Sequence, residues 1–153
     1  NFTESALIIK QARELGITTP FLGGDTWETP EFLDVGKEAV EGVVFSTFFA
    51  TEVPITDTSK EFLDAYRKEY NKEPAAVTAL GFDGYLVARA AIEKAQSLDR
   101  TKIRDAIAET KDFPGATGMI TLNEDGDAVK SAVIKVVKDG KFTYLATVEP
   151  TGM

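Results

Sequence analysis

The first place in this sequence where chemistry could occur is a glycine pair followed by an acid, a hydroxyl and an aromatic residue. The segment Gly23-Gly24-Asp25-Thr26-Trp27 follows a short apolar run and precedes a helix-start pattern. Glycine allows close approach to the backbone, and the Asp25 carboxylate could hold an ammonium group through a charge-assisted hydrogen bond. It is not a phosphate loop, because the lysine of that motif is absent and an acid repels phosphate. A plain glycine turn, with Asp25 as a local cap and Trp27 in the core or at its rim, also explains the pattern, and the pattern alone favours this second interpretation.

A second acid, Asp83, lies inside the most apolar helical stretch of the chain. An acid among apolar side chains needs a counter-charge or hydrogen bonds, and such acids are candidate functional groups. The other interpretation is that Asp83 caps or bridges to a neighbouring lobe. Its neighbours Gly81 and Gly84 favour close packing of another backbone over catalysis.

The residue types that are missing exclude most enzyme mechanisms. The chain has no Cys and no His, so it has no thiolate nucleophile, no HExxH zinc site and no Ser-His-Asp triad. A carboxylate-only hydrolase is the enzyme class that survives. The turn at 124–127 lacks the ligand spacing of an EF-hand loop. We therefore expect no enzyme, no metal and no cofactor, while the redox compartment cannot be inferred without cysteine.

The composition and net charge of the chain limit the classes of partner that it can bind. The 153 residues, 43% of them hydrophobic, can form one sizeable core or two small lobes. A formal net charge of −8 argues against a nucleic-acid partner, since phosphate binding needs clustered Lys and Arg. No apolar stretch is long enough to span a bilayer.

Capping patterns and helical periodicity predict helices between short strand-like runs. Thr3 can cap a first helix, and Thr29-Pro30-Glu31 starts a second. The segment Thr58 to Glu61 is interpreted as a capping box for a third. The stretch Ala75 to Ala95 is apolar nearly all round and should lie in the middle of the structure. Asp99 or Thr101 caps the last helix.

Strand-like runs are frequent near the C-terminus, and an Asp139-Gly140 turn between two of them is a strong hairpin signal. The fold class predicted is α/β, with mostly parallel sheets flanked by helices and a β-rich C-terminal tail. The predicted strands are a short buried one within the turn-and-strand segment 19–24, then Gly42 to Phe49, Gly118 to Leu122, Ala132 to Val137 and Phe142 to Val148.

The order and spacing of several short segments carry a resemblance over essentially the whole chain. These segments are Ile8 to Ile17, Phe21 to Asp25, Glu41 to Val44, Phe62 to Tyr70 with Glu73-Pro74, Gly81 to Gly84, Phe113 to Gly118, Asn123 to Asp127 and Val137 to Phe142. Together they resemble the C-terminal portion of the type I periplasmic (extracellular) solute-binding proteins, in the branched-chain amino acid (Leu/Ile/Val) family of ABC transporters.

The resemblance implies two α/β lobes joined by three crossovers, with ligand in the cleft between them. Residues 1–48 would belong to the second lobe, 49–130 to the first, and 131–153 would return to the second. The chain opens at Asn1 without an initiator Met or a leader, so we expect a fragment that starts mid-fold. Uncovered sheet edges in such a fragment favour a homodimer or a swapped oligomer.

The resemblance also implies a site and a role. An acid at the position of Asp25 grips the α-ammonium of a bound amino acid in this family, which reverses the preference from pattern alone. Thr26 and Trp27 would line the same crevice, and Asn1 stands where the family often has a ligand-contacting aromatic residue.

The expected function is the substrate-binding component of an ABC transporter. It binds a branched-chain or related amino acid, or a related carboxylate, and delivers it to the ABC permease in the full-length protein. Its expected location is periplasmic or extracellular, including a membrane-anchored lipoprotein. A sensory ligand-binding domain with the same fold is the first alternative, and an α/β hydrolase-type enzyme is the second.

Overall fold

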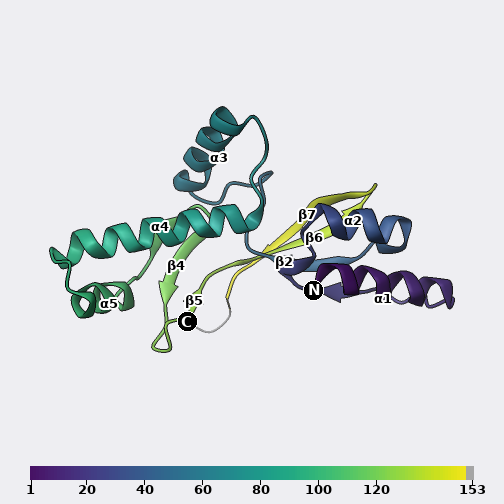
Figure 1. Ribbon diagram of the computed structural model, residues 1–153, viewed down its shortest axis with the longest axis horizontal. Coiled ribbons are helices and arrows are strands. Elements are labelled where there is room, and N and C mark those ends of the chain that lie inside the picture. The colour runs from purple at the N-terminus through teal and green to yellow at the C-terminus, as the bar shows by residue number, and fades with distance from the viewer. Residues whose placement is uncertain (151–153) are drawn as a thin grey trace. The chain divides into compact units, whose positions relative to one another are not determined.

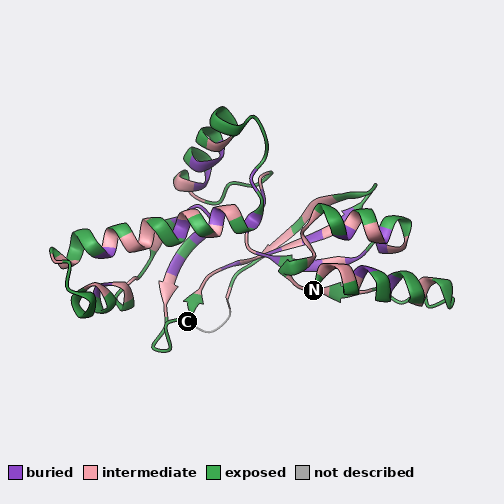
Figure 2. Cartoon of the chain, viewed as in Figure 1, coloured by how far each residue is buried: buried purple, intermediate pink, exposed green. Residues whose placement is uncertain are grey.

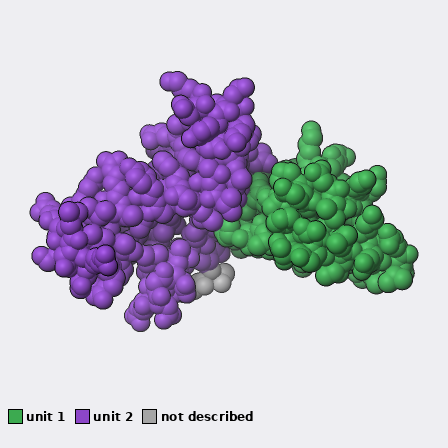
Figure 3. Space-filling view, in the orientation of Figure 1, with its two compact units in different colours: residues 1–48, 132–148 green, residues 49–131, 149–153 purple. Residues whose placement is uncertain are grey.

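The computed structural model describes residues 1–150, which fall into two compact units (Figure 3). Unit 1 comprises Asn1–Phe48 and Ala132–Val148, and unit 2 comprises Phe49–Ser131 together with Glu149 and Pro150. The chain therefore passes between the units three times. Within residues 1–150, no helix combines the length and apolar character needed to cross a membrane.

Unit 1 contains a four-stranded sheet in the order β1-β2-β6-β7. Figure 1 labels its strands β2, β6 and β7. Strand β1 (Leu22–Gly23) is parallel to β2 (Val44–Thr47), and β2 is antiparallel to β6 (Ala132–Lys138). Strands β6 and β7 (Lys141–Val148) form the predicted hairpin. Both turn residues, Asp139 and Gly140, have positive φ, 52° and 68°, as a tight hairpin turn of this kind requires.

The α/β class is confirmed, but the expectation of mostly parallel pairing is wrong for the residues described. The β1–β2 pair is parallel, while the pairs β2–β6, β6–β7, β3–β4 and β4–β5 are antiparallel. Parallel neighbours need a long crossover connection, whereas the short turns after β3, β4 and β6 reverse the chain and force antiparallel pairing.

The helices of unit 1 are α1 (Phe2–Glu14), η1 (Asp25–Trp27), α2 (Pro30–Gly36) and η2 (Lys37–Val40). The α2 start is as predicted, with the Phe32 amide donating to the Thr29 hydroxyl at 3.2 Å. The predicted cap Thr3 is wrong, because Asn1 accepts the first helical amide and Thr3 lies inside α1.

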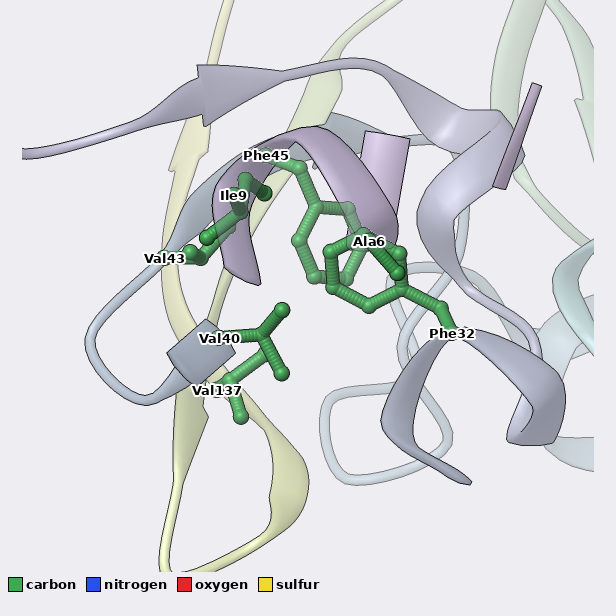
Figure 4. Close-up of a cluster of buried hydrophobic side chains, with 7 residues drawn as sticks. All are labelled: Ala6, Ile9, Phe32, Val40, Val43, Phe45 and Val137. Carbon is green, nitrogen blue, oxygen red and sulfur yellow. The ribbon is translucent and has the colours of Figure 1, made fainter. Parts of the chain in front are cut away.

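The core of unit 1 is a cluster of buried apolar side chains from both helices and the sheet (Figure 4). Phe45 of β2 is 1% exposed and meets Phe142 of β7 edge-on at 5.3 Å. The cluster consists of Ala6, Ile9, Phe32, Val40, Val43, Phe45 and Val137.

Unit 2 contains α3 (Asp57–Tyr70), α4 (Ala76–Ala95) and α5 (Arg100–Ala108) beside a small antiparallel sheet. Its strands are β3 (Phe113–Gly115), β4 (Gly118–Leu122) and β5 (Ala128–Val129). Asp99 caps α5, with the Lys102 amide at 3.0 Å. The strands β3 and β5 were not predicted, because two or three residues show no periodicity and one of them is a proline.

Two helix predictions in unit 2 need correction. The capping box of α3 joins Thr56 and Ser59 and not Thr58 and Glu61, because the Ser59 hydroxyl is the group that accepts the Thr56 amide. Helix α4 does not lie in the middle of the structure, because α5 and β3 cover only part of it and exposed stretches run along its ribbon (Figure 2). Val77 of this helix is 69% and Tyr85 is 60% exposed.

Candidate functional site

The segment Asp25–Trp27 forms one turn of 3-10 helix at the carboxyl end of β1, the edge strand of the unit 1 sheet. Gly24 precedes it in an extended conformation, and its carbonyl accepts the Trp27 amide at 3.1 Å. In open α/β sheets, ligands bind beyond the carboxyl ends of strands. The fold thus puts the predicted site residues 25–27 where such a protein can hold a ligand.

The Asp25 carboxylate is exposed and available. Within the part of the chain that the structure describes, no side chain or backbone group donates a hydrogen bond to it or forms an ion pair with it. Thr26, beside it, is also exposed. An unpaired carboxylate is an acceptor for a primary ammonium group, and such a charge-assisted bond is stronger than a neutral one.

Trp27 has a packing role that the predicted site did not require. Its ring stacks on Phe32, with centroids 5.1 Å apart and planes at 15°. The indole also covers Gly23, where a Cβ atom would lie 2.4 Å from the ring. Gly23 is therefore needed for this packing, and half-buried Trp27 anchors the turn to the core of unit 1.

Asn1 lies at the start of α1, where its Oδ1 atom accepts the Phe2 amide at 2.9 Å. Its side chain is exposed and acts as a helix cap. Among residues 1–150 no hydrogen bond joins Asn1 to the segment 25–27. Contact between Asn1 and a ligand stays a prediction.

Sequence reasoning missed a buried polar cluster directly after the turn. The Glu28 carboxylate accepts from the Lys135 ammonium at 2.5 Å and from the Thr47 hydroxyl at 2.6 Å. Both charged side chains are shielded, at 7% exposure for Lys135 and 13% for Glu28. A lysine in the middle of the apolar run of β6 was the one available signal.

Asp83 is a structural group. It is 3% exposed and accepts the amides of Ala116 and Thr117 at 2.5 and 2.9 Å, and the Thr117 hydroxyl at 2.6 Å. It therefore bridges to a backbone of its own unit and not to a neighbouring lobe. Gly115 allows this approach, since a Cβ there would lie 2.8 Å from the carboxylate. The glycines beside Asp83, predicted to do so, face open space.

Next to Asp83, the Lys130 ammonium donates a hydrogen bond to the Thr117 hydroxyl. Burial lowers the pKa of Lys130, and the nearby Asp83 charge partly opposes that shift. The Thr117 hydroxyl in turn donates to Asp83 of α4, so Lys130 belongs to the hydrogen-bonded cluster that joins α4 to the turn before β4.

Three further features of the described residues bear on possible ligand sites. No group of three or more acidic side chains there could hold a metal ion, and the 124–127 turn is an exposed hairpin turn organised by Asn123. A groove of about 820 Å³ in unit 2 is lined mainly by aromatic and aliphatic side chains, with Thr58, Glu61, Glu69 and Thr78 as its polar members. Its apolar lining includes Phe62, Ala65, Tyr66, Tyr70, Phe82, Leu86 and Phe113.

The chain belongs to the periplasmic binding protein family, because the family model described as "Periplasmic binding protein" matches residues 1–141. The resemblance found in the sequence is thus confirmed.

Individual relatives are branched-chain amino acid binding proteins by name. The Leu/Ile/Val-binding protein BraC3 of Rhizobium johnstonii is 30% identical over 125 residues, 81% of this chain and 33% of that protein. The leucine binding protein LivK of Thermotoga maritima superposes with a TM-score of 0.92 at 44% identity, over 97% of this chain and 43% of its own. LivJ of Streptococcus pneumoniae, in complex with isoleucine, gives 0.83 at 34% identity, over 97% and 42%. The chain therefore spans less than half the length of each relative.

Proposed function

We propose that this chain is part of the substrate-binding component of an ABC transporter for branched-chain or related amino acids. The observation that carries the proposal is the unpaired, exposed Asp25 carboxylate beyond the carboxyl end of β1, in a chain that the family model matches over residues 1–141. The names of the relatives support the ligand class, and one of them holds isoleucine.

The proposed chemistry is recognition of a small zwitterion without bond breaking. Asp25 accepts hydrogen bonds from the α-ammonium group, while Thr26 and the open edge of Trp27 line the crevice. Because Asp25 is exposed before binding, little desolvation opposes the contact until the ligand is enclosed. The relatives are binding proteins by name, which supports a role that is not enzymatic.

Unit 1 is proposed to form part of the second lobe and unit 2 part of the first. The division of the chain after residues 48 and 131 supports this assignment, and closure of two lobes around a ligand is a common binding motion. In the full-length protein the partner would be an ABC permease, and the location periplasmic or extracellular. Self-association through the β1 edge is proposed for this chain, since Leu22 there is 77% exposed.

A thermal-shift screen of the chain with leucine, isoleucine, valine and simple aromatic carboxylates tests the function. A ligand that binds the folded state raises its apparent stability. We expect a rise with branched-chain amino acids that is lost in Asp25→Asn. Asp34→Asn, an exposed acid on α2, is the matched control and should keep the response. An unchanged response in Asp25→Asn, or none in the wild-type chain, would contradict the proposal.

A further inference from the structure

The Glu28 cluster is built around the end of the η1 turn. One carboxylate oxygen of Glu28 accepts from Lys135 and the other from Thr47. These partners lie on the neighbouring strands β6 and β2, where Lys135 pairs with Phe45 and Thr47 pairs with Val133. The side chain of Glu28 therefore ties the residue after the turn to two strands of the sheet.

The backbone completes the attachment. The Glu28 amide donates to the Asp25 carbonyl at 3.0 Å, and the next amide, of Thr29, donates to the Trp27 carbonyl at 2.8 Å. The conformation of the turn and the anchorage of Glu28 are thus coupled. Because the Glu28 amide is hydrogen-bonded to the Asp25 carbonyl, a movement of Glu28 away from the sheet would also move Asp25.

A shielded ion pair of this kind is weak evidence for stabilisation of the fold. Removing two charges from water costs free energy that their attraction often only balances, and apolar replacements of buried pairs are frequently neutral or better. The pair does have a geometric consequence, since both oxygens of Glu28 are held in one orientation. It also neutralises Glu28, so that Asp25 is the uncompensated acid of the turn.

We propose that Glu28, held by Lys135 and Thr47, is a positioning residue that fixes the η1 turn and thereby the direction of the Asp25 carboxylate for an amino acid ligand. The inference rests on the proposed function for its ligand. The immobilisation of the turn by Glu28 does not depend on the ligand, because it follows from the contacts of Glu28 with Lys135 and Thr47.

Trp27 is the only tryptophan of the chain and lies inside this turn, so its fluorescence reports on the turn directly. The variants are Glu28→Gln, Lys135→Met and the two combined, with Glu31→Gln, an exposed acid of α2, as the control. Acrylamide quenching of Trp27 and the affinity for L-leucine are measured on each full chain, together with the midpoint of urea unfolding.

Both single variants are expected to show stronger Trp27 quenching and an affinity for L-leucine lowered about tenfold, the scale of weakening one charge-assisted hydrogen bond. The double variant leaves no unpaired buried charge, so its urea midpoint should recover while quenching and affinity remain altered. A recovered urea midpoint with altered quenching and affinity would distinguish a positioning role of Glu28 from a role in stability alone.

Wild-type quenching and affinity in the double variant would overturn the inference. If the wild-type chain binds no L-leucine, the proposed function fails, but increased quenching in the variants still supports the positioning of the turn. Unchanged quenching overturns the positioning role whether or not leucine binds.

Discussion

The core of unit 1 is a continuous apolar cluster with one shielded ion pair beside it, whereas unit 2 joins α3 and α4 to the turn before β4 through buried hydrogen bonds in addition to aromatic packing. In unit 1, side chains of α1, α2 and the sheet meet in one continuous core. In unit 2, Thr56 and Ser59 of the α3 start donate to the carbonyls of Gly115 and Ala116 at 2.7 and 2.6 Å. From the other side, Asp83 of α4 accepts the amides that follow.

Because of this difference, the two units fix the positions of their helices and strands in different ways. Apolar packing tolerates small shifts, but hydrogen bonds to a buried turn demand a set register between helix and strand. One stretch, 114–118, is therefore hydrogen-bonded to both α3 and α4 in unit 2. Unit 1, with its more continuous core, carries the candidate site on the polar end of a strand.

The largest expected loss of stability comes from a substitution in the core of unit 1. Phe45→Ala should lower the free energy of unfolding by about 3–5 kcal/mol, because it removes a buried ring and leaves a cavity. Urea unfolding followed by Trp27 fluorescence measures it, since Trp27 packs against that core. Leu22→Ala, at an exposed position, should change stability by less than about 0.5 kcal/mol. Equal effects of the two would contradict the account of the core.

The next largest loss of stability is expected when the hydrogen bonds accepted by Asp83 are removed. Asp83→Ala leaves two amides and one hydroxyl without their acceptor and should cost about 3 kcal/mol. Hydrogen exchange should accelerate at the amides of Ala116 and Thr117 and remain slow in the β6–β7 hairpin of unit 1. Retained protection at those two amides would show that the carboxylate does not hold the turn.

A smaller effect tests which hydroxyl begins α3. Thr56→Ala should cost about 1–2 kcal/mol, because it removes both the helix cap and the bond to Gly115. Thr58→Ala removes one exposed bond to Pro114 and should cost less. The two losses are compared by thermal unfolding of the α-helical signal. A larger loss for Thr58→Ala would restore the cap first expected from the sequence.

The smallest effect concerns Lys130. Its pKa is lowered from 10.5 in the folded chain, so the unfolded chain binds more protons between the folded and unfolded values. Stability should therefore rise with pH through the alkaline window just below 10.5. Urea midpoints measured across that window should rise less in Lys130→Met, whereas the exposed-lysine control Lys60→Met should keep the wild-type slope. Identical slopes in all three proteins would contradict the prediction.

Local signals in the sequence were sufficient for most elements. The cap at Thr29, the hairpin turn at Asp139-Gly140 and the place of the segment 23–27 after a strand and before α2 were predicted correctly, and Asp99 was one of the two caps predicted for α5. These features depend on residues a few positions apart, where capping and turn chemistry act.

The rest depends on residues that meet from far apart in the chain. Glu28 and Lys135 are 107 positions apart, and Asp83 finds its amides 33 and 34 positions away. No periodicity encodes such a meeting. The exposure of α4 was missed for the same reason, because composition shows that a helix is apolar but not which of its faces are covered.

The central claim is that the Asp25 carboxylate binds an α-ammonium group. Calorimetric titration of the wild-type chain and Asp25→Asn with L-leucine and with N-acetyl-L-leucine, which lacks that charge, tests it most directly. The account predicts that the wild-type chain binds leucine and loses affinity for the acetylated ligand, and that Asp25→Asn no longer distinguishes the two. A variant that prefers leucine as strongly as the wild-type chain does would contradict it.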